Sequence, residues 1–151
     1  MTGMHALLTS ALGGARRFSI SLGRYATLFQ AKIYAILASA HEIQLHGRTE
    51  KHVSIFSDSQ AALKALQATR RTSPLVQQCQ KAFNEISTWH AVDLYWVPAH
   101  AGVRGNKIAD KLARDGSVQK FVGHELDLGD SRQNIRRKIS CWLVNQHWAR
   151  W

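Results

Sequence analysis

Three side chains of the kinds that bind cations and transfer protons fall where an α/β sheet would gather them. Asp58 follows a strand expected at residues 52–56, His100 lies in the loop after a strand expected at 91–97, and Asp110 lies one helical segment later. Ligands of open α/β sheets bind beyond the carboxyl ends of the strands. The spacing therefore indicates that the three side chains converge at one rim of the sheet.

Each of these residues also has a simpler explanation. Asp58 could cap the helix that follows it, since Asp is a favoured N-cap residue. Asp110, close to Lys111 and Arg114, could belong to an ordinary ion pair on a helix surface. His100 could be a surface residue without a role. Taken singly, none of the three identifies a site.

The elements that would carry these residues follow from apolar periodicity and turn signals. Thr27 and Gln30 form a capping-box pattern that predicts a helix start, and Ser73 before Pro74 predicts another. The expected order is two strands, a helix, a strand, two helices, a strand and a helix, which is a mixed α/β domain with parallel later strands. These elements span residues 5–10, 16–22, 27–43, 52–56, 60–68, 73–89, 91–97 and 107–116.

The helix "FQAKIYAILASAHEI" carries a lysine, Lys32, near its amino end. That end of a helix bears partial positive charge and favours acids. Lys32 lies beside the apolar stripe, at the border between core and surface. The stripe consists of Phe29, Ile33, Ile36, Leu37, Ala40 and Ile43.

The composition favours a polyanion as partner. Twenty Lys and Arg against ten Asp and Glu give the 151-residue chain a net charge of +10, which attracts nucleic acid or anionic lipid. No apolar run approaches the roughly 20 residues of a membrane span. Cys79 and Cys141, without any CxxC motif, are expected to be buried thiols of an intracellular protein, cytoplasmic or nuclear.

The composition shifts after Gly116. We expect a main domain over residues 1–116, and a linker followed by a basic amphipathic helix over 117–151. The expected helix has four apolar residues on one side: Ile135, Ile139, Trp142 and Leu143.

The segments "LGRYATLFQAKIYAI", "SDSQAALKAL" and "WVPAHAGVRGNKIADKLAR" together resemble a known family. They look like the type 1 ribonuclease H domain at the C-terminal end of insect-type non-LTR retrotransposon reverse transcriptases, over roughly residues 17–116. The resemblance implies a three-layer α/β fold, a mixed sheet flanked by helices. It also implies Mg²⁺-dependent endonucleolytic cleavage of the RNA strand of RNA·DNA hybrids, within a reverse transcriptase polyprotein.

The resemblance also implies roles for individual residues. In the family, four carboxylates hold two Mg²⁺ ions. Asp58 matches one of these ligands and Asp110 the last, while His100 matches a mobile histidine that assists proton movement or product release. Gln60 matches a residue that contacts the minor groove of the hybrid, and Thr27 matches a phosphate contact.

Two of the four carboxylates have no counterpart. Lys32 stands where the family has Glu in the pattern "FQAE", and no Asp or Glu precedes Glu42. The remaining ligand of the family belongs to a "TDGS" on the central first strand, which is expected to be missing here. The resemblance thus implies a truncated and degenerate copy.

Two hypotheses follow, and a third is weaker. The first is a ribonuclease H-type hydrolase with impaired activity. The second is a catalytically inactive nucleic-acid-binding module or a non-functional retrotransposon remnant, which the carboxylate count favours. The third, a basic domain that mediates only protein contacts, leaves the matched motifs unexplained.

Overall fold

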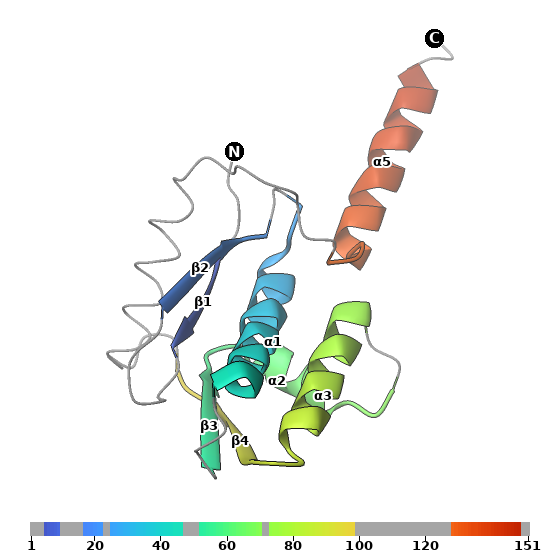
Figure 1. Ribbon diagram of the computed structural model, residues 1–151. Coiled ribbons are helices and arrows are strands. Elements are labelled where there is room, and N and C mark those ends of the chain that lie inside the picture. Colours follow the sequence, from blue (N-terminus) through green and yellow to red (C-terminus); the bar gives the residue numbers. More distant parts are fainter. Residues whose placement is uncertain are drawn as a thin grey trace.

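The computed structural model describes residues 5–9, 17–22, 25–46, 52–70, 73–98 and 128–148. The elements expected within these ranges are present, with bounds that differ by a few residues; the helix expected at 107–116 lies outside them. The elements in chain order (Figure 1) are β1 His5–Thr9, β2 Arg17–Ser21, α1 Leu28–His46, β3 His52–Ser57, α2 Gln60–Gln67, α3 Pro74–Ile86, β4 Ala91–Trp96 and α5 Arg132–Trp148.

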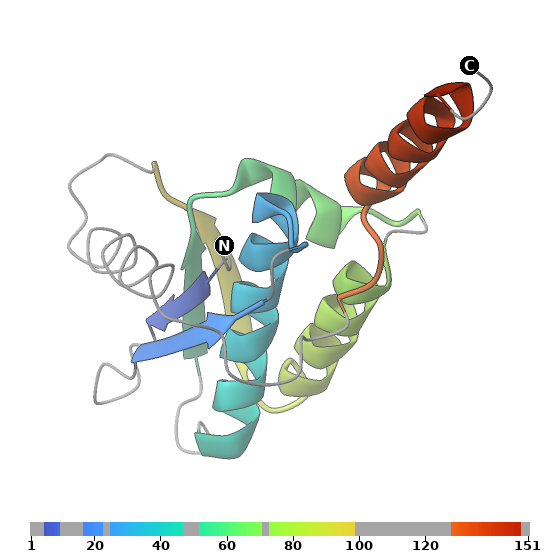
Figure 2. The ribbon, with the colours of Figure 1, turned by 90° about the horizontal axis from the view of Figure 1, so that it is seen from above.

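Helix α1 is the centre of the packing. The strands lie on one side of α1 and α3 lies on the other (Figures 1 and 2). The apolar stripe read from the sequence is the face that α1 turns to the core, and Ile33 and Ala40 are fully buried. The main cluster also takes residues from β3, α2 and α3, namely Val53, Ile55, Ala62, Leu63, Leu75, Val76, Cys79, Ala82 and Ile86.

The helix starts follow the expected side-chain chemistry. The Thr27 hydroxyl accepts a hydrogen bond from the Gln30 amide at 3.2 Å, and Gln30 Oε1 accepts one from the Thr27 amide at 3.0 Å. This reciprocal pair is a capping box. Ser73 caps α3, whose first residue is Pro74. Both predicted starts are confirmed.

The four described strands form two sheets rather than one. β1 pairs with β2 in antiparallel fashion, and β3 pairs with β4 in parallel, from His52 opposite Ala91 to Ser57 opposite Trp96. The parallel arrangement brings the carboxyl ends of β3 and β4 to the same edge, as expected. Among the described strands, β1 and β3 both lie against α1 without pairing to each other.

The two cysteines lie in different surroundings. Cys79 is buried on α3, whereas Cys141 is exposed on α5, so the expectation of two buried thiols is wrong for Cys141. That helix projects from the body of the domain (Figure 1), and projection leaves its middle turns in solvent. No described helix is long and apolar enough to cross a membrane.

We predict that iodoacetamide at pH 8 modifies Cys141 in the native protein and leaves Cys79 intact. Burial raises the pKa of the Cys79 thiol from 9.0 to about 12, and the thiolate is the nucleophile. A shift of this size lowers the thiolate fraction about a thousandfold. Mass spectrometry of native protein, with guanidinium-unfolded protein as control, measures both sites; equal modification of the two cysteines in native protein would contradict the prediction.

Candidate functional site

The carboxyl end of β3 presents Asp58 at the rim of the parallel sheet. Helix α2 begins two residues later, and its N-cap is Ser59, whose hydroxyl accepts a hydrogen bond from the Ala62 amide at 3.2 Å. Asp58 therefore does not serve as the cap, which removes the simplest alternative for this residue. Its backbone carbonyl accepts a hydrogen bond at 3.3 Å from the indole of Trp96, at the end of β4.

The carboxylate of Asp58 forms an ion pair with Lys32 of the same protein. Lys32 Nζ lies 2.7 Å from Asp58 Oδ1, and the exposed fractions of the two side chains are 32% and 15%. Lys32 reaches the rim from the second turn of α1, which packs beneath β3. A charge-assisted hydrogen bond of this length is strong for its class, and partial burial protects it from screening by salt.

This ion pair is a poor place for a divalent metal. Mg²⁺ prefers a near-octahedral cage of oxygen ligands. Asp58 offers one carboxylate, and the Lys32 ammonium beside it offsets the negative charge. Among the residues that the structure describes, no group of three or more His, Cys, Asp or Glu side chains could hold a metal ion. The described residues therefore do not fit Mg²⁺.

The structure describes only some of the other residues proposed for the site. Gln60 is the first residue of α2 and is exposed, two positions beyond Asp58. Thr27 is the capping residue of α1, and its hydroxyl proton is donated to Gln30 Oε1 at 3.0 Å. His100 and Asp110 lie outside the described residues, so their convergence with Asp58 stays a prediction.

The comparisons with known proteins agree with this architecture. The family model described as RNase H matches residues 4–118. The chain belongs to the RNase H family. Among solved structures, this RNase H domain is similar to RNase H1 from the halophilic archaeon Halobacterium salinarum NRC-1, with a TM-score of 0.54 and 25% sequence identity. The match covers 73% of this chain and 80% of that chain.

RNase H domains bind RNA·DNA hybrids and hydrolyse the RNA strand, generally with divalent metal ions. Membership thus supports nucleic acid as the partner class and agrees with the mixed α/β fold. The ion pair between Lys32 and Asp58 sets the described rim of this domain apart from a metal-binding carboxylate cluster.

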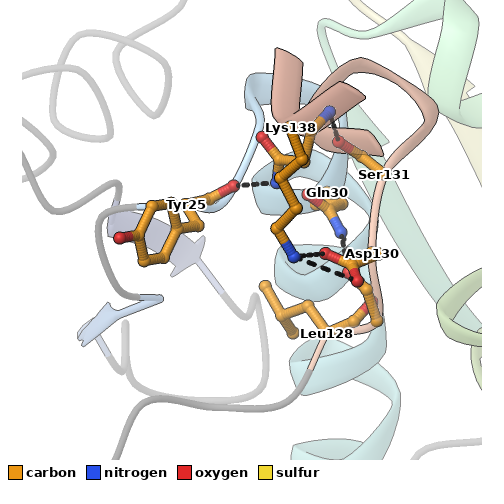
Figure 3. Close-up of polar contacts among 8 residues, drawn as sticks. Tyr25, Gln30, Leu128, Asp130, Ser131 and Lys138 are labelled. Atoms are coloured by element: carbon orange, nitrogen blue, oxygen red, sulfur yellow. Dashed lines mark hydrogen bonds and ion pairs between the residues drawn. The ribbon is translucent and has the colours of Figure 1, made fainter. Parts of the chain in front are cut away.

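Sequence reasoning missed the contacts that tie residues 128–134 to the RNase H domain (Figure 3). The Gln30 side-chain amide donates to the carbonyls of Gly129 at 2.9 Å and Leu128 at 3.3 Å, and Asn134 Nδ2 donates to the Tyr25 carbonyl at 2.7 Å. In the sequence, Gln30 indicates only the capping box with Thr27. Nothing in the sequence indicates its second role, because the partners lie about a hundred residues away.

Proposed function

We propose that this RNase H domain binds RNA·DNA hybrids and that its hydrolysis of the RNA strand is impaired. The ion pair between Lys32 and Asp58 is the observation that carries this proposal. In this pair, Asp58 matches a metal-ligand carboxylate of the family, and Lys32 stands where the family has a second carboxylate. The alternative, within the same proposal, is a catalytically inactive nucleic-acid-binding module or a remnant without function.

The repulsion between the Lys32 ammonium and a divalent metal ion would be large enough to affect catalysis. At an effective dielectric constant of 20, a unit charge about 4 Å from a divalent cation repels it by about 8 kcal/mol. Water around the partly exposed ammonium lowers this figure. Each tenfold loss of rate corresponds to about 1.36 kcal/mol, so even a third of the repulsion removes more than one decade.

Binding makes fewer demands on the site than hydrolysis. The net charge of +10 attracts the phosphate backbone, and such attraction is largely independent of base sequence. Gln60 is exposed at the start of α2, which supports the contact with the minor groove that the family resemblance implies. For Thr27 to donate a hydrogen bond to a phosphate, its hydroxyl must leave Gln30. We retain Asp110 and His100 as proposed partners of Asp58.

We further propose that a strand from outside the described residues fits between the two sheets. β1 and β3 both lie against α1. β2 pairs with the outer side of β1, and β4 pairs with the outer side of β3. A strand inserted there would pair with both inner strands and join the two sheets. In the resembling reverse transcriptases this strand carries the "TDGS" aspartate, and we propose that this domain derives from such a polyprotein.

An assay that separates binding from cleavage tests the proposal. We predict that labelled RNA·DNA hybrid is retarded by the 151-residue chain at low salt, while its RNA strand stays intact with millimolar Mg²⁺. Native and denaturing gels of the same samples give both readouts. Mg²⁺-dependent cuts that disappear in Asp58→Asn would refute the proposed impairment, and the absence of any retardation would refute hybrid binding.

A further inference from the structure

Helix α5 extends from the domain and is not part of the region that the family model matches, which ends at residue 118. Figures 1 and 2 show it projecting past the other elements. It contains four Arg or Lys residues and no Asp or Glu. Among its described side chains, five large apolar ones are 43–60% exposed, namely Ile135, Ile139, Trp142, Leu143 and Val144.

The base of α5 is fixed to the domain. Ser131 caps the helix, its hydroxyl accepting a hydrogen bond from the Asn134 amide at 3.1 Å. Asn134 is buried, and its side-chain amide donates a hydrogen bond to the Tyr25 carbonyl. The Arg137 guanidinium lies 5.7 Å from the centre of the Tyr25 ring. Before the helix, Gly129 adopts φ +73°, a left-handed conformation that suits glycine. These contacts set which side of α5 faces the domain.

The residues through which α5 contacts the domain are polar, and Ile135, Ile139, Trp142 and Leu143 lie on another side of the helix. Asn134 and Arg137 are three positions apart and so lie on one face. Ile135, Ile139 and Trp142 follow one another at spacings of four and three, which also defines a single face. With about 100° per residue, the apolar face points roughly 140° away from the face that contacts the domain. The part of the domain that the structure describes therefore leaves this apolar stripe of α5, formed by Ile135, Ile139, Trp142 and Leu143, exposed.

We propose that the apolar stripe of α5 docks into an apolar groove of a partner protein whose rim is acidic. Arg132 lies at the amino end of the stripe and Arg136 lies beside it, while the other two basic residues, Arg137 and Lys138, contact Tyr25 and Asp130. Since α5 lacks acidic residues, complementary charge on the partner must be negative. Amphipathic helices bind grooves by anchors at this spacing. This interaction is independent of the proposed binding of hybrid.

Two other occupants fit the helix less well. In a second copy of the chain, α5 would meet an identical basic helix on a molecule that also carries +10 charges. An anionic bilayer would gain only about 1 kcal/mol from each of the two arginines near the stripe, and the attraction of surface charges is screened at physiological salt.

A designed groove provides the test. The probe is a synthetic helical hairpin that presents a Leu-lined groove with Glu along both rims; the same hairpin with Lys rims is the control. Fluorescence anisotropy of the labelled hairpins measures binding to the full chain. We expect the Glu-rimmed hairpin to bind and the Lys-rimmed hairpin not to bind.

Two variants assign the binding to the stripe. Ile139→Asp should weaken binding of the Glu-rimmed hairpin at least tenfold, whereas Ser140→Asp, on the next position of the same helix, should change it less than threefold. Both positions are exposed and both substitutions add one negative charge, so the effect of charge is matched and only Ile139→Asp removes an apolar side chain from the stripe. Failure of the Glu-rimmed hairpin to bind, or equal effects of the two variants, would overturn the proposal.

Parallel experiments test the two other possible partners of α5, a second copy of the chain and an anionic bilayer. Sedimentation of the chain alone reports self-association, and flotation with phosphatidylcholine–phosphatidylserine vesicles reports membrane binding. Self-association or vesicle binding that Ile139→Asp abolishes, with no binding of the hairpin, would assign the stripe to that occupant and contradict an acidic protein partner.

Discussion

Lys32→Glu alone should leave the domain unable to cleave an RNA·DNA hybrid, and cleavage should return only when a "TDGS"-bearing strand is also added before residue 1. The substitution removes the cation that pairs with Asp58 and places a second carboxylate at the rim. By the family resemblance it still leaves three carboxylates of four. Two-metal sites need ions about 3.5–4 Å apart, and without a ligand shared by both ions their mutual repulsion is not relieved.

The expected difference is large, so a comparison of four protein variants measures it. Lys32→Glu, the strand-extended chain and the doubly repaired chain are compared with wild type by denaturing gels of labelled hybrid. We expect cleavage by the double repair at least a thousandfold above the others. Lys32→Gln in the extended chain is the matched control, since it removes the positive charge without supplying a carboxylate. Robust hydrolysis by Lys32→Glu alone would mean that the added strand is not needed. A folded but inactive double repair would count against Asp58, His100 and Asp110 as site residues.

Affinity for hybrid should fall steeply with salt. Each phosphate neutralised by Lys or Arg releases counterions, and the logarithm of affinity falls by about 0.9 per phosphate for each tenfold rise in salt. A chain with a net charge of +10 that contacts six phosphates should lose about a thousandfold in affinity between 50 and 200 mM salt.

The salt titration needs two comparisons. Hybrids of unrelated base sequence should give the same slope and nearly the same affinity, because contacts to the backbone carry no sequence information. Lys32→Gln should keep the slope almost unchanged, since the Lys32 ammonium is already paired with Asp58. An affinity that does not change over this salt range would contradict binding through the phosphate backbone.

Much of the fold could be predicted from local signals. The stripe from Ile33 to Ile43 repeats at helical spacing and is buried as expected. Thr27 with Gln30, and Ser73 with Pro74, mark helix starts because their side chains act within one turn of the chain. Likewise, the rim position of Asp58 follows from its place directly after a β-branched strand.

Features that depend on distant contacts could not be predicted. A lysine at the border of the core can extend into water or turn inward, so the sequence places Lys32 near the rim without showing its contact with Asp58. The exposure of Cys141 depends on α5 leaving the domain, which the anchor at Asn134 and Tyr25 determines. Amphipathic spacing at Ile135 and Ile139 predicts a helix but not what covers it.

We propose that Lys32, paired with Asp58, keeps this carboxylate from binding a metal ion. Titration of Mg²⁺ by isothermal calorimetry tests this. Wild type should show no saturable binding in the millimolar range. Lys32→Glu should bind Mg²⁺ at least tenfold more tightly, and the gain should disappear in the double variant Lys32→Glu with Asp58→Asn. Saturable millimolar binding by wild type that Asp58→Asn removes would contradict the claim, because it would show that Asp58 holds a metal ion despite the lysine.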